Sequence, residues 1–71
     1  MVPFQISLAA ARVNAELTQS EVAKELHVSN QTIVAWEKGK TEPSASQARL
    51  LAKLYHIPLD FIFFGKQSNL I

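Results

Sequence analysis

The chain contains no cysteine, so neither a disulfide framework nor a thiolate metal site can hold it together. It also lacks any apolar run near the ~18 residues of a membrane span, and no basic region followed by an apolar block opens it. These absences predict a soluble, cytoplasmic protein with no membrane partner. Below ~70 to 80 residues a single core seldom supplies more than ~3 to 5 kcal/mol. For a chain of 71 residues we therefore expect stability to come from helix packing and oligomerisation.

The patterns that carry catalysis are missing as well. Serine, histidine and aspartate all occur, but no nucleophile elbow, phosphate loop or paired-acid arrangement surrounds them. His27 and His56 stand apart from any carboxylate cluster, and each comes just past the end of an apolar helical stripe. Because histidine tolerates a left-handed backbone, both are interpreted as helix-ending residues rather than ligands. We expect no enzyme activity, no metal, no cofactor and no small-molecule ligand.

Two short helices joined by a sharp turn are predicted by the run LTQSEVAKELHVSNQTIVAWEK. Thr18 and Glu21 have the spacing of a capping box, in which each side chain bonds a free backbone N–H, so a helix begins just after Thr18. Ser29 is the next N-cap, and a second helix over residues 30–38 ends before Gly39. A protein can insert a helix held in this way into the major groove of DNA.

Helices on either side of this pair complete the expected fold. Residues 6–14 have apolar side chains at helical spacing, and Ser44 with Gln47 forms a second capping box at the start of a fourth helix. Pro58 begins a short fifth helix, which Gly65 ends. The side chains expected on the inward side of the fourth helix are Leu50, Leu51, Leu54 and Tyr55.

The central run resembles the helix-turn-helix of the Cro/repressor (Xre-like) family of phage and bacterial transcription regulators. Small, apolar, capping and polar positions agree at fixed spacing, and the resemblance covers roughly residues 6–65. It implies an all-α, five-helix compact domain of the phage-repressor DNA-binding type over residues 1–65, with helices 2 and 3 as the motif, followed by a tail over residues 66–71. The matching residues are Leu17, Thr18, Gln19, Val22, Ala23, Val28, Ser29, Thr32, Ile33, Trp36, Glu37, Gly39, Pro43 and Ser44.

The resemblance implies a sequence-specific regulator of transcription that binds double-stranded DNA, of phage or mobile-element type. The net charge is only +1, which predicts weak binding by a single copy, so we expect a homodimer on a pseudo-palindromic operator. Both a minimal regulator and the N-terminal part of a longer protein fit this length. The alternative is a protein-interaction module, such as an antitoxin or a coactivator or oligomerisation domain, and the low charge and phenylalanine-rich end favour it.

The second motif helix carries the residues expected to read bases. Asn30 and Gln31 stand in its first turn, which reaches base edges when this motif docks, and Val34 and Ala35 follow one turn later. An amide side chain can bond adenine N6 and N7 together, and small apolar groups suit the thymine methyl. The alternative is that the two amides are merely solvated residues at a helix start.

Polar and basic side chains around the motif are expected to contact phosphates. Gln19 begins the first motif helix, where free backbone N–H groups can help it hold a phosphate oxygen. Lys38 and Lys40 flank the Gly39 corner, where the family places groups against phosphates. The complete set of phosphate candidates is Gln19, Ser29, Thr32, Lys38, Lys40 and Thr41.

Other residues are assigned to the fold. Trp36 stands three residues after Ile33, on the helix side that packs onto the first motif helix, so we expect it in the core. The resemblance implies that Arg12 and Glu37 form a partly buried ion pair, against the alternative that both are solvated. Glu16 occupies a place where the family commonly has glycine, so this corner must either avoid a positive φ or accept strain.

The segment PLDFIFF is unusually apolar for the end of so small a domain. Phe61 and Ile62 are expected to close the core, but their apolar neighbours cannot all face inward on a short helix. An exposed apolar patch indicates an interface. The predicted homodimer contact consists of Leu59, Phe63 and Phe64. The alternative is that the two phenylalanines of this set fold under the tail, against Leu70 and Ile71.

Overall fold

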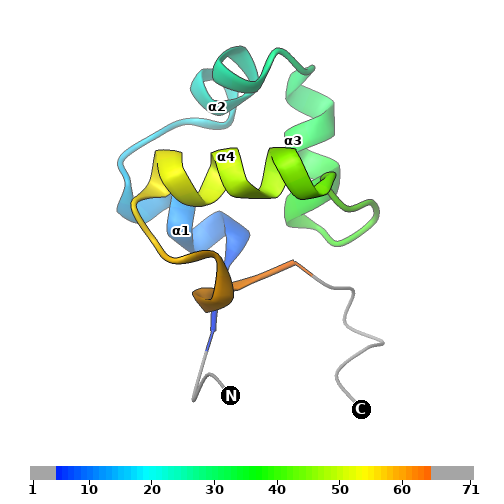
Figure 1. Ribbon diagram of the computed structural model, residues 1–71. Coiled ribbons are helices and arrows are strands. Elements are labelled where there is room, and N and C mark those ends of the chain that lie inside the picture. Colours follow the sequence, from blue (N-terminus) through cyan, green and yellow to red (C-terminus); the bar gives the residue numbers. More distant parts are fainter. Residues whose placement is uncertain (1–4, 65–71) are drawn as a thin grey trace.

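The computed structural model describes residues 5–64. In chain order the elements are β1 (Ile6–Ser7), α1 (Leu8–Asn14), α2 (Gln19–Leu26), α3 (Asn30–Glu37), α4 (Ala45–Tyr55), the 3₁₀ helix η1 (Leu59–Phe61) and β2 (Ile62–Phe63). In the view of Figure 1, α4 crosses the middle of the molecule, with α2 above it, α1 below it and α3 at its right-hand end. The helix pair predicted by the central run is therefore α2 and α3.

Both predicted capping boxes are confirmed. Thr18 Oγ1 accepts a hydrogen bond from Glu21 N at 3.0 Å, and Glu21 Oε1 accepts one from Thr18 N at 2.8 Å. Ser44 and Gln47 exchange the same two bonds at 3.2 and 2.8 Å. These bonds occupy N–H groups that a helix start leaves without an intrahelical partner, which is why α2 and α4 begin where the sequence indicates.

The first helix is shorter than expected, because Ser7 caps it. Ser7 Oγ accepts a hydrogen bond from Ala10 N at 3.0 Å and its own backbone is extended, so α1 begins at Leu8 instead of residue 6. The cap residue Ser7 and Ile6 before it form β1, which pairs in parallel with β2. Ile6 lies opposite Ile62 in this two-stranded sheet.

The predicted helical fold is confirmed, but the prediction of a fifth α-helix is wrong. Pro58 is followed by a single 3₁₀ turn, η1, in which Phe61 N donates to Pro58 O at 2.9 Å. The chain then becomes extended at Ile62, with φ −104° and ψ 129°. A β-branched side chain suits this backbone, and β1 supplies the hydrogen-bonding partner that a strand needs. The described part of the chain thus contains four α-helices, η1 and a two-stranded parallel sheet.

Each of the four α-helices in the described range ends in a left-handed corner. The backbone takes positive φ at Glu16 (61°), His27 (59°), Gly39 (76°) and His56 (57°). At each corner the next backbone N–H donates to the carbonyl five residues earlier, at 3.0 to 3.2 Å, which is the Schellman arrangement. The predicted helix-ending role of both histidines is confirmed, and Glu16 accepts the strained conformation rather than avoiding it.

The core lies between the four helices and β2. Trp36 is 5% exposed, as predicted, but Leu50 (51%) and Phe61 (38%) do not face inward as expected. Leu51, Ala52 and Tyr55 already fill the inward stripe of α4, and Leu50 is turned ~100° to the side of it. The buried apolar residues are Leu8, Ala11, Val22, Ala23, Ile33, Trp36, Leu51, Ala52, Tyr55 and Ile62.

Several predictions concern residues outside the described range. They are the end of the fifth helix at Gly65, the tail over residues 66–71 and the packing of Phe63 and Phe64 against Leu70 and Ile71. The division into a domain over residues 1–65 and a tail therefore stays a prediction. The helices within residues 5–64 lack the length and apolar character that a membrane span requires.

Candidate nucleic-acid interface

The packing of α2 against α3 fixes how α3 is presented. Val22 and Ile33, one from each helix, are 0% and 1% exposed, and Ala23 beside them is 5% exposed. The small side chain of Ala23 allows the two helices to approach closely. Ser29 begins α3 by accepting a hydrogen bond from Thr32 N at 3.1 Å. The first turn of α3 is thereby held at the surface of the domain.

The residues predicted to read bases lie together on α3. Asn30 and Gln31 are exposed in its first turn, whereas Val34 and Ala35, one turn later, are partly buried. Ser20 Oγ on α2 donates to Asn30 Oδ1 at 3.3 Å. This bond leaves the Asn30 amide N–H groups free to donate to another group. The two amides therefore place hydrogen-bond donors at the N-terminal end of α3. A helix docked in the major groove presents this end to the bases.

A partly buried cluster of polar side chains connects the start of α2 to the end of α3. Arg12 Nε donates to Glu37 Oε2 at 2.7 Å, and Gln19 Nε2 donates to Glu37 Oε1 at 2.9 Å. Arg12 also reaches the corner after α1, where its Nη1 donates to Leu17 O at 2.9 Å. The Arg12 and Glu37 side chains are 16% and 7% exposed. The ion pair predicted from the sequence is present, and it is largely buried.

The surroundings of this cluster shift two pKa values. The hydrogen bond to Glu37 raises the pKa of Arg12 above its ordinary value. Burial, and secondly the negative charge of Glu37, raise the pKa of Tyr55 to about 12. The Tyr55 hydroxyl is buried and has no hydrogen-bond partner among the described residues. A buried hydroxyl in that state costs stability, and it strongly prefers to keep its proton.

The predicted phosphate ligands lie in three places around α3. The Gln19 amide is bound to Glu37 through one N–H, so its second N–H is the donor left for a phosphate. Lys38, Lys40 and Thr41 are exposed around the Gly39 corner, and neither lysine forms an ion pair within the described chain. Ser29 and Thr32 bond each other through their hydroxyls at 2.9 Å at the start of α3. Polar groups thus surround the exposed side of α3 from both ends.

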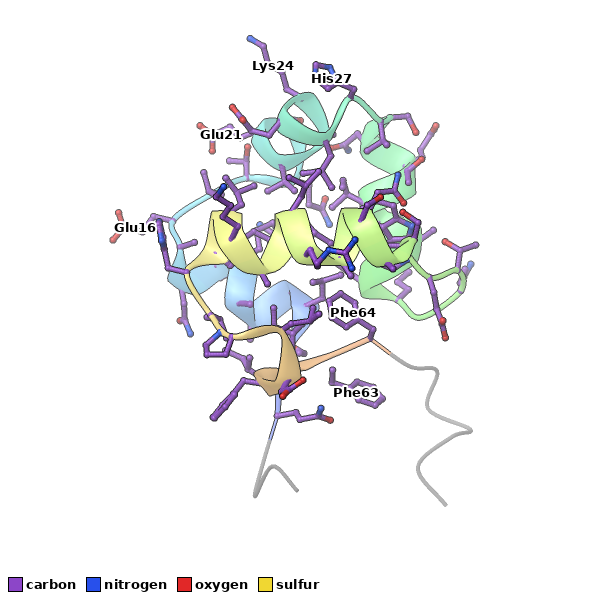
Figure 2. The ribbon with its side chains drawn as sticks, in the orientation of Figure 1. Glu16, Glu21, Lys24, His27, Phe63 and Phe64 are labelled. Atoms are coloured by element: carbon purple, nitrogen blue, oxygen red, sulfur yellow. The ribbon has the colours of Figure 1, made fainter. Side chains whose placement is uncertain are left out.

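The residues predicted for a dimer contact are spread over two elements. Leu59, in η1, is 38% exposed. Phe63 and Phe64 follow in and after β2, where Phe64 packs against the core and both side chains are partly buried. In Figure 2 the Phe64 ring lies close to the helices, whereas the Phe63 ring points away from them. The three residues therefore do not form one helix face, and Phe61, expected in the core, is as exposed as Leu59.

Two parts of the site had no clear signal in the sequence. Ser20 and Asn30 are ordinary polar surface residues ten positions apart, and only the crossing of α2 and α3 brings them together. Likewise, the contact from Arg12 to Leu17 O depends on the shape of the corner after α1. Within residues 5–64, no group of three or more His, Asp or Glu side chains could hold a metal ion.

Comparison with known proteins gives a family for this arrangement. The helix-turn-helix family model matches residues 8–62, which contain all four α-helices. An uncharacterized HTH-type transcriptional regulator of Methanocaldococcus jannaschii is 49% identical over 53 residues, or 75% of this chain and 80% of the relative. No solved structure matches the chain.

Two further relatives are regulators that are longer than this chain. The cryptic phage CTXphi transcriptional repressor RstR of Vibrio cholerae is 31% identical over 67 residues, which are 94% of this chain and 60% of RstR. The HTH-type transcriptional regulator DicA of Escherichia coli is 32% identical over 58 residues, which are 82% of this chain and 43% of DicA. The family match agrees with two features of the structure, namely the capped α2–α3 pair and the exposed first turn of α3. The chain belongs to the helix-turn-helix family of Cro/repressor-type transcriptional regulators.

Proposed function

We propose that the protein is a sequence-specific regulator of transcription that binds double-stranded DNA and inserts α3 into the major groove. The observation that carries the proposal is the first turn of α3, where Asn30 and Gln31 are exposed side by side while Val34 and Ala35 follow one turn behind. Amide donors and acceptors read adenine edges, and small apolar side chains contact the thymine methyl. The ion pair and the α2–α3 packing hold this face rigid.

Phosphate contacts on both sides of α3 would set its register in the groove. The proposed contacts come from Gln19, through its second amide N–H, and from Lys38, Lys40 and Thr41 at the corner after α3. Ser29 and Thr32 add hydroxyl groups at the helix start. Such contacts give affinity and orientation without sequence preference, which matters in a chain whose net charge is +1.

We further propose that two copies bind a pseudo-palindromic operator, as a phage-type or mobile-element regulator acting in the cytoplasm. The likeness to a phage repressor supports this type. Leu59 and Phe61, each 38% exposed on η1, together with Phe63 beside them, provide the apolar surface for the contact between copies. Such exposed apolar groups on a small domain indicate an interface.

Selection from a pool of random duplexes, with sequencing of the bound fraction, tests the proposal. A regulator of this kind enriches a motif with two-fold symmetry. Recovery of a duplex pool without any enriched motif would contradict DNA recognition. That result would favour a protein-interaction module such as an antitoxin or coactivator domain, a reading that rests on the low net charge and on the exposed apolar side chains.

A further inference from the structure

An apolar groove runs between α2 and α4, and no residue of α3 lines it. It encloses about 370 Å³ and has Leu26, Leu50 and Leu54 among its lining residues. Leu50 is 51% exposed, which is unusual for a leucine in the middle of a packed helix. Leu50 thus adds exposed apolar surface beside the groove, on a side of the domain that α3 does not line.

The two sides of the groove carry opposite charges. Glu25 comes from α2 and Lys53 from α4, and both side chains are exposed. Neither forms an ion pair within the described part of the chain. The acidic side and the basic side are thus both available to an occupant, which must present the reverse arrangement to be complementary.

We propose that the occupant is a second copy of this chain, bound face to face. A two-fold axis that runs along the groove places the α2 side of each copy over the α4 side of the other. Glu25 then lies against Lys53 of the other copy, twice, and the Leu50 side chains of both copies are buried between them. An axis across the groove would instead oppose Glu25 to Glu25, which like-charge repulsion disfavours.

This contact goes beyond operator binding and is separate from the proposed contact at η1. The groove is lined by α2 and α4 alone, apart from His56 at the end of α4. It therefore allows one DNA-bound dimer to associate with the next. Because α2 and α4 have 8 and 11 residues, the shared face is small, and the association is weak and depends on protein concentration.

Charge reversal tests the groove directly. In a Leu59→Glu background, which removes the contact at η1, sedimentation equilibrium at high protein concentration should still detect association. Glu25→Lys or Lys53→Glu alone opposes like charges twice and should raise the dissociation constant about tenfold or more. An equimolar mixture of the two variants restores both opposite-charge contacts, so it should associate as the background does. The doubly reversed protein, with both changes in one chain, should also recover.

Lys24→Glu provides the matched control, because Lys24 is exposed on α2 and points away from α4 in Figure 2. It should leave the association unchanged. The proposal is overturned if the Leu59→Glu background does not self-associate, if either single reversal leaves association intact, or if the mixture fails to restore it. Operator binding is measured separately on the same proteins, so failure of DNA recognition and failure of the groove contact give different results.

Discussion

At the scale of single residues, the left-handed corners are the clearest departure from what side-chain type alone would favour. Three of the four positive-φ corner residues carry a Cβ, namely Glu16, His27 and His56. The left-handed conformation costs a residue with a Cβ ~1 to 2 kcal/mol, whereas glycine adopts it freely but loses more entropy on folding. These corners are therefore places where the fold accepts strain.

We expect Glu16→Gly to stabilise the protein by about 0.5 to 1 kcal/mol, since it removes the left-handed cost and loses part of that gain to chain entropy. The Glu16 side chain is exposed, so little else changes. Urea unfolding measures the effect, and Glu16→Ala is the control, because it removes the charge but keeps the Cβ. Equal stability of the glycine and alanine variants would show that the corner is not strained.

The residue scale is also where the sequence was most informative. The capping boxes at Thr18 and Ser44, the core place of Trp36 and the helix-ending role of both histidines depend on neighbours within a few positions along the chain, and all are confirmed. The Ser20–Asn30 bond depends on helix packing, and no local pattern indicates it.

At the scale of elements, the Glu37 carboxylate at the end of α3 accepts hydrogen bonds from Arg12 of α1 and Gln19 of α2. It therefore connects three helices. We expect Glu37→Ala to destabilise the fold by ~3 to 5 kcal/mol, because it leaves the guanidinium of Arg12 buried without its charge partner. Replacing Arg12 and Glu37 together by methionine should recover much of that loss. Thermal melts of the single and double variants measure both effects, and small additive losses would show that the pair contributes little.

Tyr55 of α4 is buried near the charge of Glu37, and its raised pKa makes the stability of the fold depend on alkaline pH. Its pKa is about 12 in the folded protein against ~10 in an unfolded chain. The folded state therefore holds the phenolic proton more tightly, and this stabilisation is present below pH ~10 and is lost as the pH rises toward 12.

The free energy of unfolding of the parent protein should therefore fall by about 2 kcal/mol more between pH 10 and 12 than that of Tyr55→Phe. Lysine titration affects both proteins equally and cancels in the difference. Near pH 7, Tyr55→Phe should be as stable as the parent or slightly more stable, because the hydroxyl has no hydrogen-bond partner among residues 5–64. Parallel pH profiles for the two proteins would contradict the raised pKa.

The end of the chain shows where element prediction fails. A proline followed by an acidic residue is typical of a helix start, and η1 does form there. The chain does not continue as a helix after η1, because Ile62 pairs with Ile6 of β1, 56 positions earlier. No local sequence pattern predicts a contact between two segments so far apart in the chain. The residues expected at the dimer contact therefore do not lie on one helix, because Leu59 is in η1 and Phe63 is in β2. The contact itself stays a prediction.

At the scale of the whole molecule, the low net charge makes the placement of each lysine important. Lys40 is exposed at the corner after α3 and has no ion-pair partner in the described chain. If it contacts a phosphate, Lys40→Ala should weaken binding about equally on all DNA sequences and lower the slope of log K against log salt by roughly 1. Lys24→Ala removes the same charge from α2 and should leave the slope unchanged. Loss of affinity at one base position alone would be inconsistent with a phosphate contact.

Base reading by α3 can be tested by operator selection with Gln31→Ala beside the parent protein. The recognition face has amides but no arginine or lysine in its first turn, so the parent should select half-sites whose most constrained positions are A·T pairs, with centres ~34 Å apart. The variant should bind the best operator ~1 to 3 kcal/mol more weakly and lose preference at one base pair in each half-site. An unchanged sequence preference in the variant would remove Gln31 from base recognition, and a single unpaired half-site in the parent would contradict the dimer.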